Sequence, residues 1–192
     1  MKSTKVSTLC AVAMTTAIIA ILSQIALPSP TGVPFTLQTF AVALVGYILL
    51  PKLSFYSILL YLLLGAVGLP VFTALRGGLP HLAGLTGGFL WGYLLYAPLC
   101  SLGIKKSTGS GFHKRYPAFL GGLAGLLICH VLGVFQYTWL TTNSLKTAFF
   151  LVSLPYLQKD VLSVAGAYMT AKAVRGRLKA LPILQDFSPK RP

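Results

Sequence analysis

A series of apolar runs, separated by short polar segments, constrains the fold of this chain more than any other feature. Each run reaches or approaches the roughly 20 residues that a helix needs to span a hydrocarbon core of about 30 Å. Charged residues make up only 9% of the 192 residues, against roughly a quarter in soluble domains. We therefore predict an all-α membrane protein with six transmembrane helices and a single integral membrane domain over residues 1–192. The helices are expected at approximately residues 9–27, 35–50, 53–68, 87–104, 118–140 and 157–174.

Two apolar stretches have a second interpretation. The first run follows Lys2 and Lys5, as the apolar part of a secretory signal peptide does. Residues 9–27 are long for such a peptide and further apolar runs follow, so we expect a retained first helix. Residues 148–156 (AFFLVSLPY) are apolar but short, and Pro155 interrupts them. They are typical of a re-entrant or interfacial piece before the sixth helix.

The distribution of lysine and arginine predicts the orientation. With the N-terminus inside, most of the 16 cationic residues fall on the cytoplasmic side, as the positive-inside rule requires. We therefore expect both termini in the cytoplasm, a basic cytoplasmic tail over residues 175–192, and outward-facing loops at residues 28–34 and 69–86. The cations assigned to the inner side are Lys2, Lys5, Lys52, Lys105, Lys106, Lys114, Arg115, Lys172, Arg175, Arg177, Lys179, Lys190 and Arg191.

The net charge of +14 would suggest nucleic-acid binding if the protein were soluble. Here the cations lie between apolar runs, as membrane topology requires, and they are not interleaved with aromatic residues on a polar face. We therefore expect the lipid bilayer, and no nucleic acid, among the partners. Tyr116, Trp139 and Tyr156 lie near segment ends and are typical of an interfacial aromatic belt.

The glycine-rich connection within residues 61–93 (YLLLGAVGLPVFTALRGGLPHLAGLTGGFLWGY) is the strongest candidate for a ligand-binding loop. It is much longer than the median connection of about 4–6 residues. Its glycines permit positive φ angles and a close approach of the backbone to a ligand, and it carries the cation Arg76. The glycines expected to let the loop close over a ligand are Gly77, Gly78, Gly84, Gly87 and Gly88.

Asp160 is the most informative charged residue, because only it and Asp186 are acidic in the entire chain. It lies about one turn inside the sixth segment, where a charge is costly and therefore indicates function. The alternative is that Asp160 only complements the positive end of the helix dipole, beside Lys159. Adjacent side chains on a helix diverge, so Lys159 need not neutralise it. One small polar helix face, which favours a cavity wall, is shared by Asp160, Ser163, Ala167 and Thr170.

Further polar groups lie at the start of the second helix. Pro34 suits the first helical position, and Thr36 and Gln38 offer neutral hydrogen-bonding groups one turn below the surface. These groups have the alternative of bonding to backbone or to a neighbouring helix. In the predicted topology, Arg76, Gln38 and Asp160 converge on one outward pocket. Arg76 suits a ligand carboxylate and Asp160 accepts N–H donors, which favours a small ligand, anionic at one end and amide-like at the other.

The sequence gives little support to chemistry other than binding. It has no histidine pair at metal-ligand spacing, no G-x-S-x-G and no second acid for acid–base catalysis. It also lacks G-x-x-x-x-G-K-[ST], so we expect a transporter component without its own ATPase motif, not an enzyme. Ala13 and Ala17 in the first helix have the spacing of a close helix–helix contact in lipid, either internal or with a partner.

Four stretches of the sequence form a recognisable set. They are PFTLQTF in the second helix, YLLLGAVGLPVF, the run RGGL…GLTGGFLWGY, and an acid after PY in the last helix. In this order, over roughly residues 9–175, they resemble the BioY family, the biotin-specific substrate-binding (S) components of energy-coupling-factor (ECF) transporters. The resemblance implies a six-helix S-component fold in the bacterial cytoplasmic membrane, with high-affinity biotin binding near the outer face.

The resemblance also implies partners and residue roles. A transmembrane coupling (T) subunit would dock on the first helix at Ala13 and Ala17, and two ATPase subunits would supply energy. Asp160 would accept the ureido N–H groups of biotin, Arg76 would bind a polar end of it, and Gln38 and Tyr61 would line the site. No cofactor is expected; the ligand is biotin.

The chain departs from the family pattern at two positions. Family members often have proline between Gly84 and Thr86, where this chain has Leu85. They also tend to have a lysine three residues after the aspartate, where this chain has Ser163, so Lys159 is the candidate substitute. Two other functions stay open: a stand-alone or ion-coupled facilitator for biotin or another small vitamin, and a membrane-embedded enzyme or structural subunit.

Overall fold

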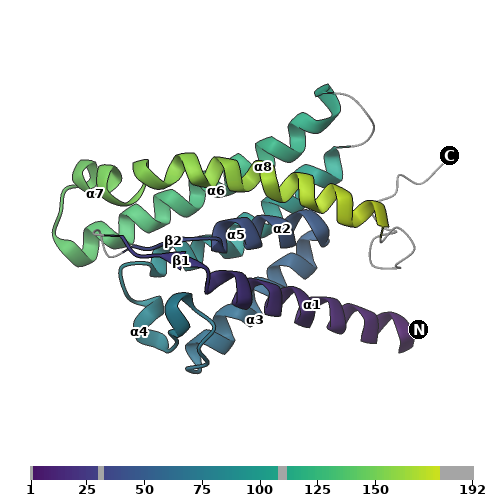
Figure 1. Cartoon of the computed structure of the whole chain (residues 1–192), viewed down its shortest axis with the longest axis horizontal. Helices are drawn as coiled ribbons and strands as arrows, with labels where there is room; N and C mark the ends of the chain where they lie inside the picture. The colour runs from purple at the N-terminus through teal and green to yellow at the C-terminus, as the bar shows by residue number, and fades with distance from the viewer. Residues whose placement is uncertain (1, 30–32, 108–111, 178–192) are drawn as a thin grey trace.

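The structure is a computed structural model that describes residues 2–29, 33–107 and 112–177. Helices run roughly along its long axis, and a short two-stranded ribbon is the one β-sheet among the described residues (Figure 1). In chain order the elements are α1 (Lys2–Ser23), β1 (Ala26–Leu27), β2 (Phe35–Thr36), α2 (Gln38–Ile48), α3 (Pro51–Ala66), the 3₁₀ turn η1 (Thr73–Leu75), α4 (Leu79–Leu82), α5 (Gly87–Lys106), α6 (Phe112–Thr141), α7 (Leu145–Val152) and α8 (Leu154–Arg177).

Three of the described helices are long and apolar enough to cross a membrane: α1, α5 and α6. A fourth crossing exists if α7 and α8, which meet at an angle of 50°, count as one bent span. The break between them, at Ser153, lies inside the stretch 148–156 that was predicted to be interrupted. α2 and α3 are apolar but have only 11 and 16 residues. The number of six spans therefore stays a prediction.

The first predicted helix ends earlier than expected, and the second begins later than expected. α1 ends at Ser23 and α2 begins at Gln38, and between them Ala26 pairs with Thr36 in an antiparallel ribbon. The prediction that Pro34 begins a helix is therefore wrong. A proline disfavours helical geometry in the residue before it, and the prolines of the PSPTGVP stretch favour extended chain here.

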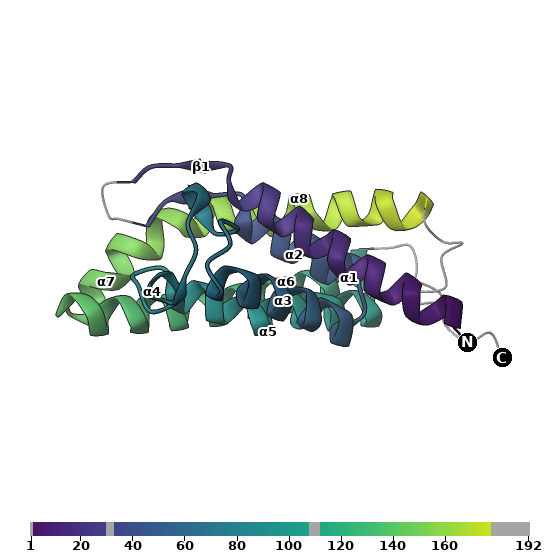
Figure 2. The ribbon, with the colours of Figure 1, turned by 90° about the horizontal axis from the view of Figure 1, so that it is seen from below.

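α2 lies at the centre of the bundle and contacts α1, α3, α5 and α8. Its side chains are apolar on every side, which is the pattern of a helix buried all round. Figure 1 shows α2 between α8 and α1, and Figure 2 shows it between α8 and the helices α3, α5 and α6. Its fully buried residues include Ala41, Val42, Ala43 and Tyr47.

Glycines allow α5 and α6 to pack in close contact. A Cβ atom on Gly88 would lie 2.2 Å from the carbonyl oxygen of Leu132, and one on Gly92 would lie 2.7 Å from Cys129 Cα. Such small residues drive helix association in lipid, where the hydrophobic effect between helices is absent. The contact fixes α6, and with it His130, against the rest of the bundle.

The two ends of the bundle differ in structure. The ribbon, α4 and α7 gather at one end, whereas the first turn of α1 and the last turn of α8 lie at the other (Figure 1). This arrangement agrees with termini on one side of a membrane, although the predicted cytoplasmic orientation remains untested. α8 continues to Arg177, so the predicted tail 175–192 begins as helix; residues 178–192 lie outside the described residues.

Candidate functional site

A cavity of about 500 Å³ opens at the end that holds the ribbon and α4. Its volume lies in the range of roughly 300–1,000 Å³ that is typical of small-molecule sites. Arg76, Gln38 and Asp160 all line it, which confirms that these three residues converge on one cavity. Lys159 and Gly84 line it as well. The apolar part of the wall includes Leu85, Phe89, Leu90, Tyr93 and Val152.

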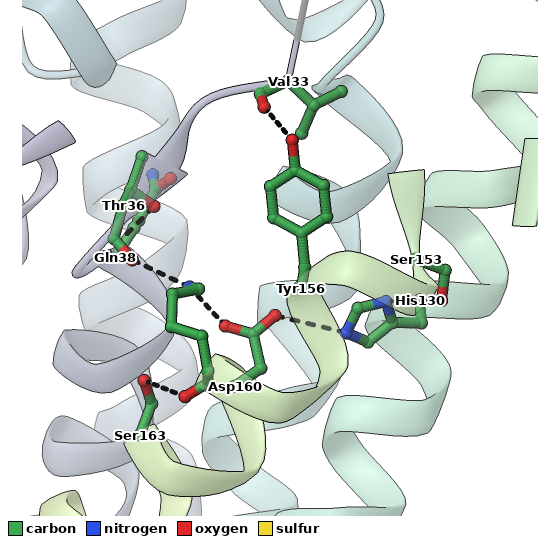
Figure 3. Close-up of polar contacts among 9 residues, drawn as sticks. Val33, Thr36, Gln38, His130, Ser153, Tyr156, Asp160 and Ser163 are labelled. Carbon is green, nitrogen blue, oxygen red and sulfur yellow. Dashed lines mark hydrogen bonds and ion pairs between the residues drawn. The ribbon is translucent and has the colours of Figure 1, made fainter. Parts of the chain in front are cut away.

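Asp160 is buried in α8 and forms an ion pair with its neighbour. Lys159 Nζ lies 2.5 Å from Asp160 Oδ1, and it also donates to the carbonyl oxygen of Thr36, 2.9 Å away (Figure 3). The expectation that Lys159 need not neutralise Asp160 is therefore wrong. The flexible four-carbon stem of lysine brings the ammonium back to the carboxylate although the two Cα–Cβ bonds diverge.

His130 of α6 contacts the other oxygen of the same carboxylate. Its Nε2 lies 3.2 Å from Asp160 Oδ2, and its Nδ1 lies 2.9 Å from Ser153 Oγ (Figure 3). The sequence interpretation found no histidine pair at metal-ligand spacing, gave His130 no role and missed this contact. The available signal was a polar side chain inside an apolar membrane run, which indicates a buried partner.

Tyr156 also belongs to this wall of the cavity, and its assignment to an interfacial belt is wrong. The side chain is buried, and its ring stacks on Phe35 with centroids 4.2 Å apart. The hydroxyl donates to the carbonyl oxygen of Val33 (Figure 3), and it lies 3.0 Å from Ser29 Oγ. Tyr156 therefore ties the α1–α2 connection to α8.

Another part of the cavity wall is a loop that is held by Gln24, the residue after α1. Gln24 Oε1 accepts from the Leu75 N–H at 2.8 Å, and its Nε2 donates to the Phe72 carbonyl at 3.1 Å. Ala74 and Leu75 have φ angles of 59° and 55°, a left-handed conformation that is costly for residues with a Cβ. Arg76 follows this strained turn and is exposed where it lines the cavity.

Of the five glycines expected to close over a ligand, only Gly84 lines the cavity. Gly77 packs against backbone, since a Cβ there would lie 2.3 Å from the Leu69 carbonyl oxygen, and Gly78 has a φ of 95°. Gly87 and Gly88 belong to α5 and allow it to approach α4 and α6. These four positions shape the loop and its packing, and the prediction that they cover the ligand is not supported by their location.

Gln38 and Tyr61 act as a pair, but only Gln38 reaches the cavity. Gln38 Nε2 donates to the Tyr61 hydroxyl at 2.6 Å, and Tyr61 is fully buried behind it. The prediction that Tyr61 lines the site is therefore wrong. Thr170 is also outside the site, because it is exposed on α8, whereas Ser163 and Ala167 are buried.

His81 of α4 lines the cavity beside the loop wall. Its ring stacks on Phe72 with centroids 5.1 Å apart, and its Nε2 lies 3.4 Å from the Thr86 hydroxyl. Burial, and then the positive charge of Arg76, lower the pKa of His81 below its ordinary value of 6.5. At neutral pH this histidine is therefore uncharged.

Comparison with known proteins identifies the family. The model of the BioY family matches residues 1–180. The chain belongs to the BioY family. It is 38% identical to biotin transporter BioY2 of Lactococcus lactis over 84% of this chain and 86% of that one. It is 34% identical to biotin transporter BioY of Thermotoga maritima over 88% and 93% of the two chains.

The fold agrees with the same assignment. A crystal structure of the S-component for biotin from an ECF-type ABC transporter matches with a TM-score of 0.80 and 26% identity, over 97% of this chain and 98% of that chain. This likeness confirms the predicted helical S-component fold. Together with the apolar helices, it makes this BioY-family chain a multi-pass membrane protein.

The two departures from the family pattern lie at the cavity and beside it. Leu85 lines the cavity and packs near Phe89 and Tyr156. Ser163 is buried, but its hydroxyl donates to the carbonyl oxygen of Lys159 and so serves the helix itself. In this BioY-family chain the ammonium nearest to Asp160 comes from Lys159, which agrees with the proposed substitution.

Proposed function

We propose that this chain is the high-affinity substrate-binding S component of an ECF-type system for biotin uptake. The family, and the biotin transporters named above, support the substrate. The single observation that carries the proposal is the cavity itself, which is lined by both a buried carboxylate, Asp160, and a guanidinium, Arg76. A small ligand that carries both N–H donors and a carboxylate would find a partner for each in this cavity.

Biotin has the chemistry that such a cavity recognises. Its ureido ring offers two N–H donors to Asp160, and its carboxylate suits Arg76, which forms two parallel hydrogen bonds to such a group. The apolar remainder of the molecule would pack against the apolar wall around Phe89, Leu90 and Tyr93. Gln38 would supply a neutral polar contact, held in place by Tyr61.

The proposed partners are a T subunit and two ATPase subunits in the bacterial cytoplasmic membrane, with both termini inside. One face of α1 is engaged within the chain, where Thr15 Oγ1 and Ser57 Oγ of α3 lie 2.9 Å apart. Ala13 and Ala17 are exposed on another face. A free small-residue face in lipid supports a docking site for another helix.

The deciding experiment is calorimetric titration of biotin into the purified protein in detergent, with riboflavin and thiamine as controls. We expect submicromolar binding of biotin and no heat from the controls. A folded sample that does not bind biotin, or that binds a control vitamin equally well, would refute the proposal.

A second experiment separates the S component from a stand-alone or ion-coupled facilitator. Biotin uptake is measured in cells that express this chain with and without the T and ATPase subunits. We expect uptake at low external biotin to require those subunits. Uptake without them that collapses on addition of a proton uncoupler would instead identify a facilitator.

A further inference from the structure

We propose that His130 is a positioning residue, a neutral imidazole with its proton on Nε2, that aims the Asp160 carboxylate into the cavity. This inference rests on the proposed function, because it assigns a role to the residue behind the ligand-binding acid. His130 itself does not line the cavity. It acts through Asp160.

The geometry places His130 between two polar groups in an otherwise apolar helix. Its side chain is 5% exposed and that of Asp160 is 8% exposed. Nε2 faces Asp160 Oδ2 at 3.2 Å, and Nδ1 faces Ser153 Oγ at 2.9 Å (Figure 3). Ser153 lies at the break between α7 and α8, so three helices meet at this chain of contacts.

The partners determine which nitrogen carries the proton. An ionised carboxylate only accepts hydrogen bonds, so the nitrogen that faces it, Nε2, carries the hydrogen. The Ser153 hydroxyl then donates to the unprotonated Nδ1. Charge balance favours the neutral ring, because Lys159 already supplies one positive charge to Asp160 at 2.5 Å. From α5, the uncharged ring of Phe89 packs against His130 in a T-shaped arrangement, with centroids 5.7 Å apart.

The far side of His130 gives a second, independent reason for a neutral ring. His130 and Ser153 also line an apolar groove of about 670 Å³ on the outer side of α6, α7 and α8, together with residues such as Leu126, Phe149 and Leu157. His130 thus lies between Asp160, which lines the ligand cavity, and this apolar groove. A cation in this wall would be costly, whereas a neutral imidazole is not.

The position of the carboxylate is what the ligand requires. A carboxylate has about four acceptor sites on its two oxygens. Lys159 Nζ lies against Oδ1, and His130 Nε2 lies against Oδ2. With one nitrogen beside each oxygen, the remaining acceptor sites are available to the ligand. Without His130, the Asp160 carboxylate would be free to rotate, and the ion pair with Lys159 alone would set its orientation.

The tautomer can be measured directly. The chain has three histidines, so ¹⁵N-histidine labelling gives a simple NMR spectrum, in which the His130 signals are assigned by their loss in His130→Gln. We expect the neutral Nε2–H form for His130 at pH 7 in the ligand-free protein. A proton on Nδ1, or protons on both nitrogens, would overturn the proposal.

The effect on binding is tested with two substitutions of similar size. His130→Leu removes the donor, and we expect biotin to bind about 10- to 100-fold more weakly, the loss typical of a hydrogen bond to a charged group. His130→Gln keeps an amide N–H for Asp160 and an oxygen for Ser153, and we expect binding within about threefold of the parent. Gel filtration and melting temperature verify that both variants fold.

A double-mutant cycle separates positioning from a general structural role. If His130 acts through Asp160, adding His130→Leu to Asp160→Asn weakens binding no further. Unchanged binding in His130→Leu, equal loss in both His130 variants, or independent losses in the cycle would each contradict the proposal. If the parent does not bind biotin, the proposed function fails, while the tautomer in the ligand-free protein still decides the state of His130.

Discussion

The two walls of the cavity are built by different means. The helical wall presents Asp160 and Lys159 from α8, with His130 behind them in α6, and the charged groups there are paired and largely buried. The loop wall presents Arg76 after two left-handed residues, Ala74 and Leu75. That wall depends on amide hydrogen bonds from Gln24 and lies exposed.

The difference assigns different tasks to the two walls. Helices fixed by close packing hold a carboxylate within small tolerances, which suits a group that must accept particular N–H donors. A strained, exposed turn opens at a lower free-energy cost than a packed helix. We therefore expect the helical wall to determine which ligand binds and the loop wall to determine how readily it enters and leaves.

The largest expected effect comes from the acid of the helical wall. Asp160→Asn removes the ionised acceptor for two ureido N–H groups, and we expect the biotin Kd to rise about 100-fold, or roughly 3 kcal/mol. Isothermal titration calorimetry measures it. The matched control is Asp186→Asn, since these are the only two acidic residues of the chain. Equal affinity in Asp160→Asn and the parent would show that Asp160 of the helical wall does not take part in ligand recognition.

A smaller effect is expected at the cation of the loop wall. Arg76 is exposed, so water screens its interaction with a ligand carboxylate. We expect Arg76→Ala to weaken biotin binding about tenfold, and Arg76→Lys to lie between that variant and the parent. Lys146→Ala, which removes an exposed cation of α7 outside the cavity, serves as the control. The same calorimetric titration should show no change there.

Loss of the Gln24 contacts should change mobility more than affinity. In Gln24→Ala the Leu75 N–H and the Phe72 carbonyl lose their partner, so we expect faster hydrogen exchange over residues 71–76 and a loss of affinity of only about threefold. Exchange read by mass spectrometry measures the first effect. Ser163→Ala, which removes a hydroxyl bond from the helical wall, should leave that exchange unchanged. Unaltered exchange in Gln24→Ala would mean that the loop is held by other contacts.

The smallest effect is a pH dependence of the loop wall. The pKa of His81 is lowered in the folded protein, so the unfolded chain binds more protons at acidic pH. The contribution of neutral His81 to the free energy of unfolding is therefore fully present above the ordinary pKa of about 6.5, and it is lost as the pH falls below that value. His81→Phe keeps an aromatic ring on Phe72 but does not titrate. We expect the melting temperature of the parent to fall more than that of His81→Phe between pH 7 and pH 5; parallel curves would contradict this.

The sequence predicts the helical character and the main charged residues of the site because both depend on local patterns. Long apolar runs indicate helices in lipid, and a charge within such a run, Asp160, is detectable without a structure. The partners of Asp160 are not detectable in this way. His130 lies 30 positions earlier, and its contact depends on how α6 and α8 pack.

The errors in the sequence interpretation have the same origin. A glycine that permits close helix packing, such as Gly88, has the same sequence signature as one that shapes a binding loop. Tyr156 at the end of an apolar run suits a membrane interface, yet the neighbouring strand β2 covers its ring. The residues 26–36 were partly assigned to helices because their composition is apolar, whereas their prolines favour extended chain.

The charged side chains that line the cavity also have an electrical consequence. Among the described lining residues, Arg76 and Lys159 are positive and Asp160 is negative, with His81 neutral at pH 7. The empty cavity thus carries one net positive charge, and a bound monocarboxylate brings it to zero. Moving one charge through a membrane potential of 100 mV involves about 2.3 kcal/mol. If the binding site crosses the membrane during transport, the membrane potential therefore does no work on the loaded cavity, because that cavity is neutral. The electrical work of importing the anion falls on the outward return of the empty, positively charged cavity.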